Sequence, residues 1–373
     1  MKKLLVMGAL ACGLTLSAVA PSQALPATTS WVDAGLFEMI RFSGPISVSV
    51  TGSGFDTTSG TISVDKPAGA TVVAAYLTSA YNIDSATRTD VMTLNGSPVT
   101  FSHKSLLNGA GIDKYSALFA DVTDLVKSDI DAAPAGTMTF PIYEGALDFG
   151  QTWYNDGSEL VVVYDDPAKL GTVSSVIIMF GGARSIGDSF ELQFPALTNL
   201  SVQEIWLSLG INYSAQTPVN KSQASTVEVT TSSNSTPETV TTTAGGADDA
   251  TGWALLSVGG LGDSLTLPDL TDPLAADDEL YGLNPFLNTG DTSISINTIN
   301  SSFDDQIFQA VAFLDGIALE GATTVGTAAP DSEGLANTGA IEFNVAPLIG
   351  VTLLAGGLAA RRLLSSRTRS TIN

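Results

Sequence analysis

Cysteine and histidine are almost missing from this sequence, which holds one of each, Cys12 and His103, among 373 residues. Transition-metal centres that depend on clustered Cys and His ligands are therefore not expected. Basic residues are scarce as well, with 15 Lys and Arg against 38 Asp and Glu and a formal net charge of −23. Because phosphate contacts need clustered Lys and Arg, the sequence predicts no nucleic-acid partner.

Hydrophobic residues make up 44% of the chain, which is enough to build a core and argues against wholesale disorder. The 36 glycines and 16 prolines indicate a chain with many turns rather than a collagen. The length fits either two ordinary domains or one large β-sandwich. This composition favours a secreted or surface protein.

The N-terminal segment has the pattern of a secretory signal. Two lysines precede an apolar run, and small residues provide a cleavage site between Ala24 and Leu25. We therefore expect residues 1–24 to be a signal peptide. An uncleaved membrane anchor and a lipoprotein modified at Cys12 are the alternatives. Cleavage after Ala24 would remove the only cysteine and exclude disulfides, zinc–thiolate sites and thiol nucleophiles.

A second apolar run, residues 343–360, lies near the other end of the sequence. At about 1.5 Å per residue, a helix of this length can just cross the hydrocarbon core of a membrane. Arg361 and Arg362 follow at once, and positive charge there would keep the tail cytoplasmic and the body outside. The pattern predicts a transmembrane segment followed by stop-transfer arginines.

The segment Leu335-Ala336-Asn337-Thr338-Gly339 stands shortly before this run. The pentapeptide, the apolar run and the arginines, in this order, resemble the sorting signal of sortase substrates on Gram-positive bacteria. The common signal has Pro at the second position. Ala336 is similar to the variant that class E sortases recognise. The resemblance covers residues 335–373.

This resemblance implies that the protein is itself the substrate of a sortase. The enzyme's thiolate would attack the carbonyl carbon of Thr338, Gly339 would leave with the tail, and a wall amine would resolve the acyl-enzyme. The membrane would then be a transient partner and peptidoglycan the final attachment, which makes the body extracellular and anchored to the cell wall. The alternative is a surface protein that keeps its C-terminal membrane anchor.

Between the two signals the sequence predicts an all-β fold, an antiparallel β-sandwich or jelly roll. Segments of strand length alternate or run apolar with β-branched residues. These segments are 46–51, 71–76, 137–142, 159–164, 175–180, 189–194, 204–209, 253–258, 292–297 and 307–314. Turns such as Asn95-Gly96 and Asp156-Gly157 are expected to separate strands, and short helical turns are expected at 121–127 and 277–283.

A faint internal repeat suggests that the body holds two related halves. Residues 136–142 and 290–296 share a glycine, a hydroxyl, an apolar residue and an isoleucine at matching positions. Each follows a similar apolar lead-in and precedes a buried strand, 156–164 in one case and 304–313 in the other. Chance similarity between β-strands is the alternative.

The body is accordingly divided into consecutive segments. They are a first sandwich half at 25–200, a second half at 201–322 with a polar hairpin or loop at 214–246, and a linker at 323–334. A linker of small residues would space the body away from its anchoring point.

Three segments of the first half resemble a loosely defined class of exported bacterial β-domains of unknown function. They are Ala75-Tyr76-Leu77, Asp121-Val122-Thr123 and the run from Gly157 to Tyr164. The resemblance implies framework strands and brings no activity with it.

No catalytic set stands out. Gly262-Asp263-Ser264-Leu265 matches the nucleophile block of GDSL hydrolases, but no histidine follows Ser264. We therefore interpret this block as a turn and His103 as an ordinary exposed or hydrogen-bonded residue. A glycosidase needs only two carboxylates about 5 to 9 Å apart, which so acidic a chain allows but does not locate. No enzyme is expected, and a wall-delivered carbohydrate-active hydrolase is the alternative.

Calcium is a better candidate than a transition metal, because it prefers the oxygen ligands that this chain offers in abundance. The candidate ligands are Asp272, Asp277, Asp278, Glu279, Asp304 and Asp305. None of them has EF-hand spacing, and solvated acidic turns are the alternative. No other cofactor is expected.

These observations predict a non-enzymatic, wall-anchored surface protein with a structural or adhesive role. Its ligand would be a glycan or a host surface. The contacts would come from loops and exposed aromatic residues such as Trp153, Tyr154 and Trp253, which could equally belong to the core.

Overall fold

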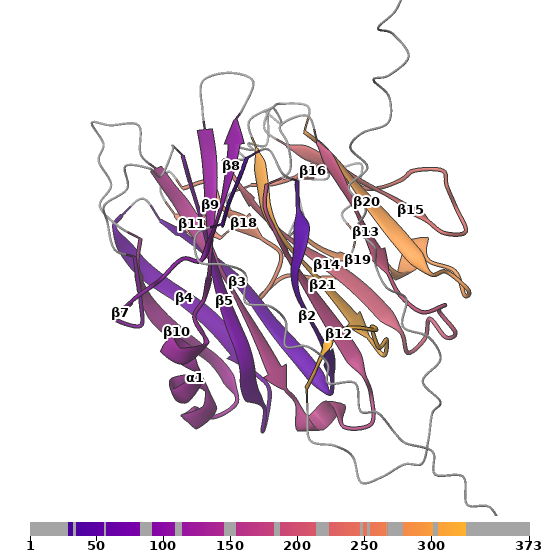
Figure 1. Cartoon of the computed structure of the whole chain (residues 1–373), viewed down its shortest axis with the longest axis horizontal. Coiled ribbons are helices and arrows are strands. Elements are labelled where there is room, and N and C mark those ends of the chain that lie inside the picture. Colours follow the sequence, from indigo (N-terminus) through magenta and orange to yellow (C-terminus); the bar gives the residue numbers. More distant parts are fainter. Residues whose placement is uncertain are drawn as a thin grey trace, which may run out of the picture. The chain divides into compact units, whose positions relative to one another are not determined.

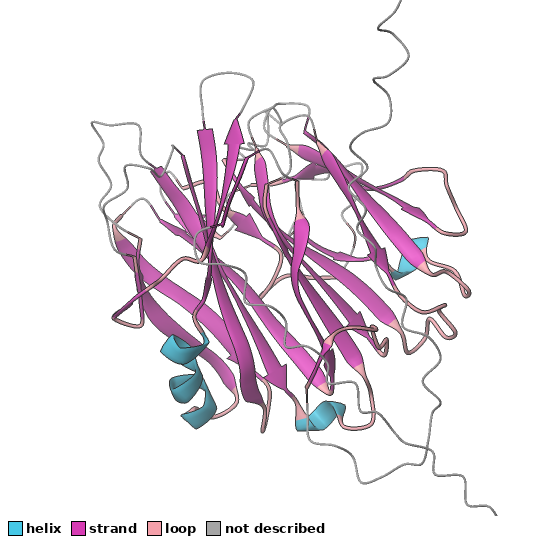
Figure 2. Cartoon of the chain, viewed as in Figure 1, coloured by secondary structure: helices cyan, strands magenta, loops and turns pink. Residues whose placement is uncertain are grey.

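The computed structural model describes residues 29–32, 35–55, 57–82, 92–108, 114–144, 154–182, 187–213, 224–246, 249–251, 254–265, 267, 279–300 and 305–325. Within these residues the chain is almost entirely β-structure, with one α-helix and two short 3₁₀ helices (Figure 2). The all-β prediction is confirmed. No helix of the described residues is long and apolar enough to cross a membrane, and the predicted span 343–360 lies outside them.

Eight strands of the first half are paired as in a jelly roll. In chain order the first pairs with the eighth, the second with the seventh, the third with the sixth and the fourth with the fifth, all antiparallel. These strands are β3 (Ile46–Phe55), β4 (Ser59–Lys66), β5 (Thr71–Asn82), β6 (Thr93–Leu94), β7 (Ser97–Pro98), β9 (Lys114–Asp121), β10 (Gly136–Tyr143) and β11 (Tyr154–Asp165).

Eight strands of the second half repeat the same nested antiparallel pairing. They are β12 (Ser174–Phe180), β13 (Asp188–Gln193), β14 (Glu204–Asn212), β15 (Ser225–Thr231), β16 (Glu238–Ala244), β19 (Leu280–Gly282), β20 (Ser293–Asn300) and β21 (Gln306–Asp315). The body is therefore a double jelly roll in which each half has a four-stranded outer sheet and a larger inner sheet.

Extra strands extend the inner sheets, and some of them link the two jelly rolls. They are β1 (Thr29–Val32), β2 (Phe37–Gly44), β8 (His103–Asn108), β17 (Ala250–Thr251), β18 (Ser257–Val258) and β22 (Thr323–Thr324). β1 pairs with β8 of the first half, whereas β2 pairs with β12 of the second. β17 comes from the second half but pairs with β3 of the first. These exchanges make the halves interdependent.

Three apolar cores lie between the layers. One fills the first jelly roll beneath α1 (Thr123–Ala132), and another fills the second jelly roll. The third lies between the two inner sheets, with side chains from β5, β9 and β11 on one side and from β12 and β21 on the other. Figure 1 shows the outer sheet of β4 and β10 on one side of the two inner sheets and that of β15 and β20 on the other. We call the middle layer the inter-roll core.

The predicted repeat coincides with equivalent strands of the two jelly rolls. Residues 136–142 lie in β10 and residues 290–296 lead into β20, which are the seventh strands of their halves. The buried strands that follow them, β11 and β21, are the eighth. The lead-ins contain the sixth strands, β9 and β19, followed by α1 and by the 3₁₀ helix η4 (Asn284–Phe286).

The sheets divide the chain earlier than the expected border at residue 200. β12 and β13 belong to the second jelly roll, and β11 ends the first at Asp165. The 3₁₀ helix η2 (Pro167–Lys169) lies in the connection between the two. The border follows from pairing, because β12 and β13 find their partners in β21 and β20.

Three local expectations need correction. Asp156-Gly157 does not separate strands but lies inside β11 at a register shift, where Gly157 has φ +147°. The helical turn expected at 277–283 is replaced over Leu280–Gly282 by β19, which pairs with β14. Of the expected strand 253–258 the structure describes 254–258, and within this range only Ser257–Val258 form a strand. By contrast, the hairpin within 214–246 is present as β15 and β16, and Asn95-Gly96 forms the tight turn between β6 and β7.

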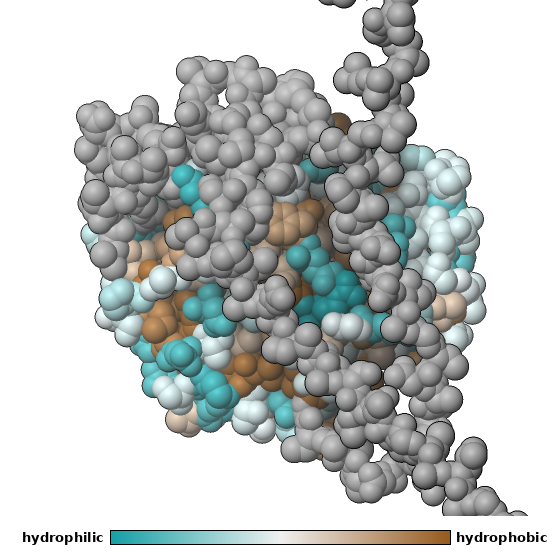
Figure 3. Space-filling view, in the orientation of Figure 1, coloured by the Kyte–Doolittle hydropathy of each residue, from teal (hydrophilic) through white to brown (hydrophobic). Residues whose placement is uncertain are grey.

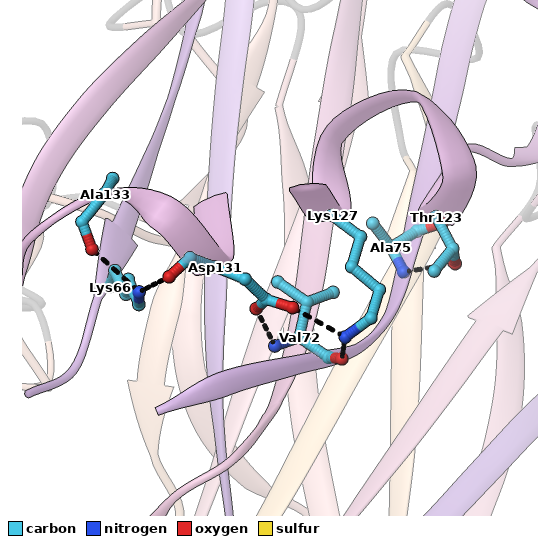
Figure 4. A network of polar contacts seen from close by, with 7 residues as sticks. All are labelled: Lys66, Val72, Ala75, Thr123, Lys127, Asp131 and Ala133. Atoms are coloured by element: carbon cyan, nitrogen blue, oxygen red, sulfur yellow. Dashed lines mark hydrogen bonds and ion pairs between the residues drawn. The ribbon is translucent and has the colours of Figure 1, made fainter. Parts of the chain in front are cut away.

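The helix α1 takes the place of a neighbouring strand along part of β5 (Figure 4). β9 pairs with β5 only from Tyr76 onward. Beyond that point Thr123 Oγ1 accepts the N–H of Ala75 at 2.9 Å, and Asp131 Oδ1 accepts the N–H of Val72 at 2.7 Å. Lys127 Nζ donates to the Val72 carbonyl and to Asp131 Oδ2. A helical i, i+4, i+8 stripe thus satisfies an open strand edge.

Lys66 binds the C-terminal end of the same helix. Its buried ammonium donates to the carbonyls of Asp131 and Ala133, both at 2.8 Å (Figure 4). These carbonyls lie in the last turn of α1 and at its C-cap residue, where a positive charge also complements the helix dipole. α1 is therefore fixed to the sheet along its side and at its C-terminus.

Candidate functional site

Most of the site residues expected from the sequence lie outside the described part of the chain. This group comprises the cleavage site Ala24–Leu25, the pentapeptide Leu335–Gly339, Arg361, Arg362, the candidate calcium ligands Asp272, Asp277, Asp278 and Asp304, and the aromatic residues Trp153 and Trp253. The side chain of Tyr154 is also outside the described set. Their roles stay predictions.

The two described calcium candidates are buried and engaged with backbone or hydroxyl donors. Glu279 Oε1 accepts the N–H of Gly245 at 2.6 Å, and Asp305 Oδ2 accepts the hydroxyl of Ser225 at 2.8 Å. Both contacts join separate segments of the second jelly roll. Within the described ranges, no three His, Cys, Asp or Glu side chains are grouped so as to hold a metal.

His103 lies against the inter-roll core and not on the surface. Its side chain is buried, its Nδ1 shares a hydrogen bond with Ser102 Oγ at 2.8 Å, and its ring meets Phe119 edge-on at 6.0 Å. Burial lowers the pKa of the imidazole. Ser264 follows a turn at Gly262 and is exposed.

An unexpected group of polar side chains faces the inter-roll core. We call it the interface polar cluster, and each member is completely buried. It consists of Thr78 on β5, Glu159 on β11, Ser208 and Asn212 on β14, and Gln306 and Gln309 on β21.

Strand alternation fixes the direction of these side chains, because successive residues of a strand point to opposite faces. Leu77 and Leu160 pack in the core of the first jelly roll, so Thr78 and Glu159 face the other way. In the second jelly roll, Leu207, Leu209, Ile211 and Ala310 pack in its own core. Their neighbours Ser208, Asn212 and Gln309 therefore face the first jelly roll.

The cluster meets across the interface at Gly210. A Cβ atom at this glycine would lie 2.2 Å from Glu159 Oε2, so the carboxyl group occupies the space that a side chain would need. Gly210 is directly opposite Gln309 in the β14–β21 register, and Glu159 is directly opposite Thr78 in the β5–β11 register. Ser208 and Asn212 flank Gly210 on the same strand face.

The six side chains have no hydrogen-bond partner among the residues that the structure describes. An unsatisfied buried donor or acceptor costs about 1–3 kcal/mol, and native proteins rarely leave several together. Burial is the main cause that raises the pKa of Glu159 well above its ordinary value, and the negative charge of Asp249 adds to it. The fold therefore retains an energetically costly group of buried polar side chains in a mainly apolar layer.

Asp156 forms a second polar link between the jelly rolls. Its Oδ2 accepts the N–H of Tyr213 at 2.6 Å and its Oδ1 accepts the N–H of Leu255 at 2.8 Å. Burial raises the pKa of this carboxyl to about 6, although both hydrogen bonds act in the opposite direction. One side chain of the first jelly roll thus fixes two separate segments of the second.

The polar cluster was missed at the sequence level, although a signal was present. Glu159 and Gln309 interrupt or flank apolar runs of strand length. When strand alternation directs a carboxyl or amide side chain into a core, that side chain has either a functional role or a buried hydrogen-bonding role. Choosing between these required knowledge of which sheets face each other.

A scan of protein families gave no match, and a search of curated proteins gave none either. Among solved structures, a chain described under "The Triple Jelly Roll Fold and Turret Assembly in an Archaeal Virus" is 10% identical, with a TM-score of 0.16. The alignment covers 75% of this chain and 61% of that one. At this score the likeness is not informative, and the assignment as a double jelly roll rests on the strand pairing alone.

Proposed function

We propose that this is a non-enzymatic surface protein that a sortase attaches to peptidoglycan and that displays a double jelly roll outside the cell. The observation that carries the proposal is the order of Leu335–Gly339, the apolar run 343–360 and the arginine pair behind it. The body supports it, because its last described strand, β22, ends only a short linker before the pentapeptide. Export, sorting and attachment are all inferred from the sequence.

The charge of the displayed body restricts the ligand. Loss of residues 1–24 and 339–373 would remove six of the 15 basic residues and one of the 38 acidic ones, which leaves a net charge of −28. Such a body repels polyanions. On the face seen in Figure 3, hydrophilic side chains gather over the region of β2, where Arg41 is paired with Glu38. We propose a neutral glycan of the wall or of a host surface as the ligand.

One contact supports aromatic residues as the binding elements. Asp156 and Leu255 are joined by a hydrogen bond of 2.8 Å. Asp156 follows Trp153 by three residues, and Leu255 follows Trp253 by two. The tryptophans themselves lie outside the described residues, and we propose them as the side chains that would stack on a sugar.

The anchoring step is tested by Thr338→Ala in the producing cell. We expect the protein to move from the peptidoglycan fraction to the membrane or the medium, because Thr338 supplies the carbonyl that the thiolate attacks. Asn337→Ala is the matched control and should leave the wall fraction unchanged, since this position varies in the signal. A wall fraction that is equally large in both variants contradicts sortase attachment.

The binding role is tested with purified residues 25–338 on arrays of wall and host glycans, with and without calcium. Binding that is lost in Trp153→Ala and Trp253→Ala supports the proposal, and a requirement for calcium would support the predicted metal site. A parallel hydrolysis screen addresses the carbohydrate-active alternative. Turnover that a single Asp or Glu substitution abolishes would contradict the non-enzymatic role.

A further inference from the structure

We propose that the interface polar cluster binds one monovalent alkali cation, Na⁺ or K⁺, between the two jelly rolls. The inference does not depend on how the protein is anchored or what it binds outside. It rests on the convergence of fully buried oxygen atoms from four strands at one place in the inter-roll core.

The first step is geometric. Glu159 reaches from β11 to the backbone of Gly210 on β14, and Gln309 is the cross-strand neighbour of that glycine. Thr78 lies directly opposite Glu159, and Ser208 lies two residues before Gly210 on the same face. Carboxyl, amide and hydroxyl groups of both jelly rolls thus face the inter-roll core around Gly210. Asn212 and Gln306 lie directly opposite each other two register pairs further along.

The second step concerns unmet hydrogen-bonding capacity. None of these groups has a protein partner within the described ranges, although each is as buried as the leucines beside it. Buried polar atoms are normally satisfied by protein, by ordered water or by a bound ion. The amide and hydroxyl groups can each turn an oxygen toward a hard cation, and an ionised Glu159 offers acceptors only.

The third step concerns charge. The described basic side chains with assigned contacts are engaged elsewhere: Arg41 with Glu38, Lys66 with α1, Lys127 with Asp131 and Lys169 with Asp315. His103 is on β8, and β9 and β5 separate it from β11. A bound cation would supply the positive charge that lets Glu159 ionise in this apolar layer.

The fourth step selects the charge of the ion. A divalent calcium site normally gathers several carboxylates, and within the described chain no three acidic side chains are grouped in this way. The second acid near Glu159 is Asp249, whose Oδ2 already accepts the N–H of Val258 at 2.6 Å. One carboxylate with amide and hydroxyl oxygens matches a single positive charge, as neutral oxygens do in potassium sites.

The test measures urea unfolding of the purified protein in NaCl, KCl and choline chloride at equal ionic strength. We expect the midpoint in NaCl or KCl to exceed that in choline chloride and to rise with the logarithm of the salt concentration. Glu159→Gln should abolish this difference, because the amide lacks the charge. The control Glu144→Gln should keep it, since Glu144 is also buried but accepts a hydrogen bond from Ser158 on the opposite face of β11.

Two further measurements keep the result decisive. If Glu159→Gln does not fold, Ser208→Ala removes one oxygen and should reduce the salt-specific shift. Crystals grown with Rb⁺ should show an anomalous peak beside Glu159. Three results would overturn the proposal. Equal midpoints in all three salts would indicate that water fills the cluster. A salt-specific shift that is as large in Glu159→Gln or Ser208→Ala as in wild type, or a shift that only calcium produces, would also contradict it.

Discussion

Glu159 of the first jelly roll and Gly210 of the second meet across the inter-roll core, with the carboxyl group lying where a side chain at position 210 would begin. Gly210 does not need a left-handed backbone, since it is absent from the positions with positive φ. The requirement for glycine therefore comes from the opposing sheet. The two positions form one unit of the interface.

This relationship predicts a coupled pair of substitutions. Gly210→Ala should lower the free energy of unfolding by about 1–3 kcal/mol, because its methyl group overlaps Glu159 Oε2 in a closely packed layer. In the Glu159→Ala background the same methyl should cost much less, since the carboxyl is gone. Urea unfolding of the two single variants and the double variant measures the coupling. Strictly additive effects would contradict the contact.

Asp156 predicts a pH dependence of stability. Its pKa is about 6 in the folded protein against 3.8 for the ordinary group. Between these values the unfolded chain has lost the proton that the folded protein keeps, so the free energy of unfolding falls as pH rises. The fall amounts to about 3 kcal/mol and is complete above about pH 7.

Asp156→Asn isolates this effect, because the amide does not titrate while the remaining acids are unchanged. The free energy of unfolding of wild type minus that of the variant should fall from pH 4 to pH 7, because only the wild type loses stability over this range. Below pH 3 this difference should be constant. The loss of one hydrogen bond in the variant shifts the difference by the same amount at every pH. A difference that is flat from pH 4 to pH 7 would contradict the raised pKa.

The repeat could be predicted from the sequence because it is carried by local pattern. Residues 136–142 and 290–296 share glycine, hydroxyl and apolar positions, and they lie in or lead into equivalent strands. Strand length and alternation depend on residues close together in the chain. The hairpin at Asn95-Gly96 was predictable for the same reason, since two residues with positive φ define its turn.

The polar cluster could not be predicted, because it depends on contacts between distant strands. Glu159 and Gly210 are on different sheets, and nothing local to either residue indicates that they meet. The strand exchanges were hidden for the same reason. β17 pairs with β3 over two residues only, Ala250 with Gly54 and Thr251 with Phe55. Local propensity does not specify a contact of such short length.

The contacts of Asp131 predict that side chains of α1 hold the helix against the edge of β5. Asp131→Ala should lower the free energy of unfolding by about 1–3 kcal/mol, because the N–H of Val72 loses its acceptor and Lys127 loses its ion-pair partner. Asp124→Ala is the control, since Asp124 is an exposed acid in the first turn of the same helix and should change stability by no more than about 0.5 kcal/mol. Thermal unfolding of both variants measures the difference. Equal effects would show that helix charge, and not the strand edge, sets the stability.

Asp291 makes the corresponding link in the second jelly roll. Its Oδ1 accepts the hydroxyl of Ser232 and the N–H of Ser233, both at 2.8 Å, while its Oδ2 accepts the N–H of Asn288 at 2.7 Å. Burial alone would raise its pKa, but these hydrogen bonds outweigh burial and lower it. The carboxylate joins the turn after β15 to the segment before β20.

Asp291→Ala should therefore destabilise the protein by about 1–3 kcal/mol at neutral pH, since two backbone N–H groups lose their acceptor. A lowered pKa means that this contribution is present above about pH 4 and is lost as pH falls through the folded-state pKa. Glu191→Ala, an exposed acid on neighbouring β13, is the control and should have little effect at any pH. Chemical unfolding at pH 7 and pH 3 compares the two. A penalty for Asp291→Ala that is equally large at both values would mean that the neutral acid serves as well as the carboxylate, and would contradict the role assigned to its charge.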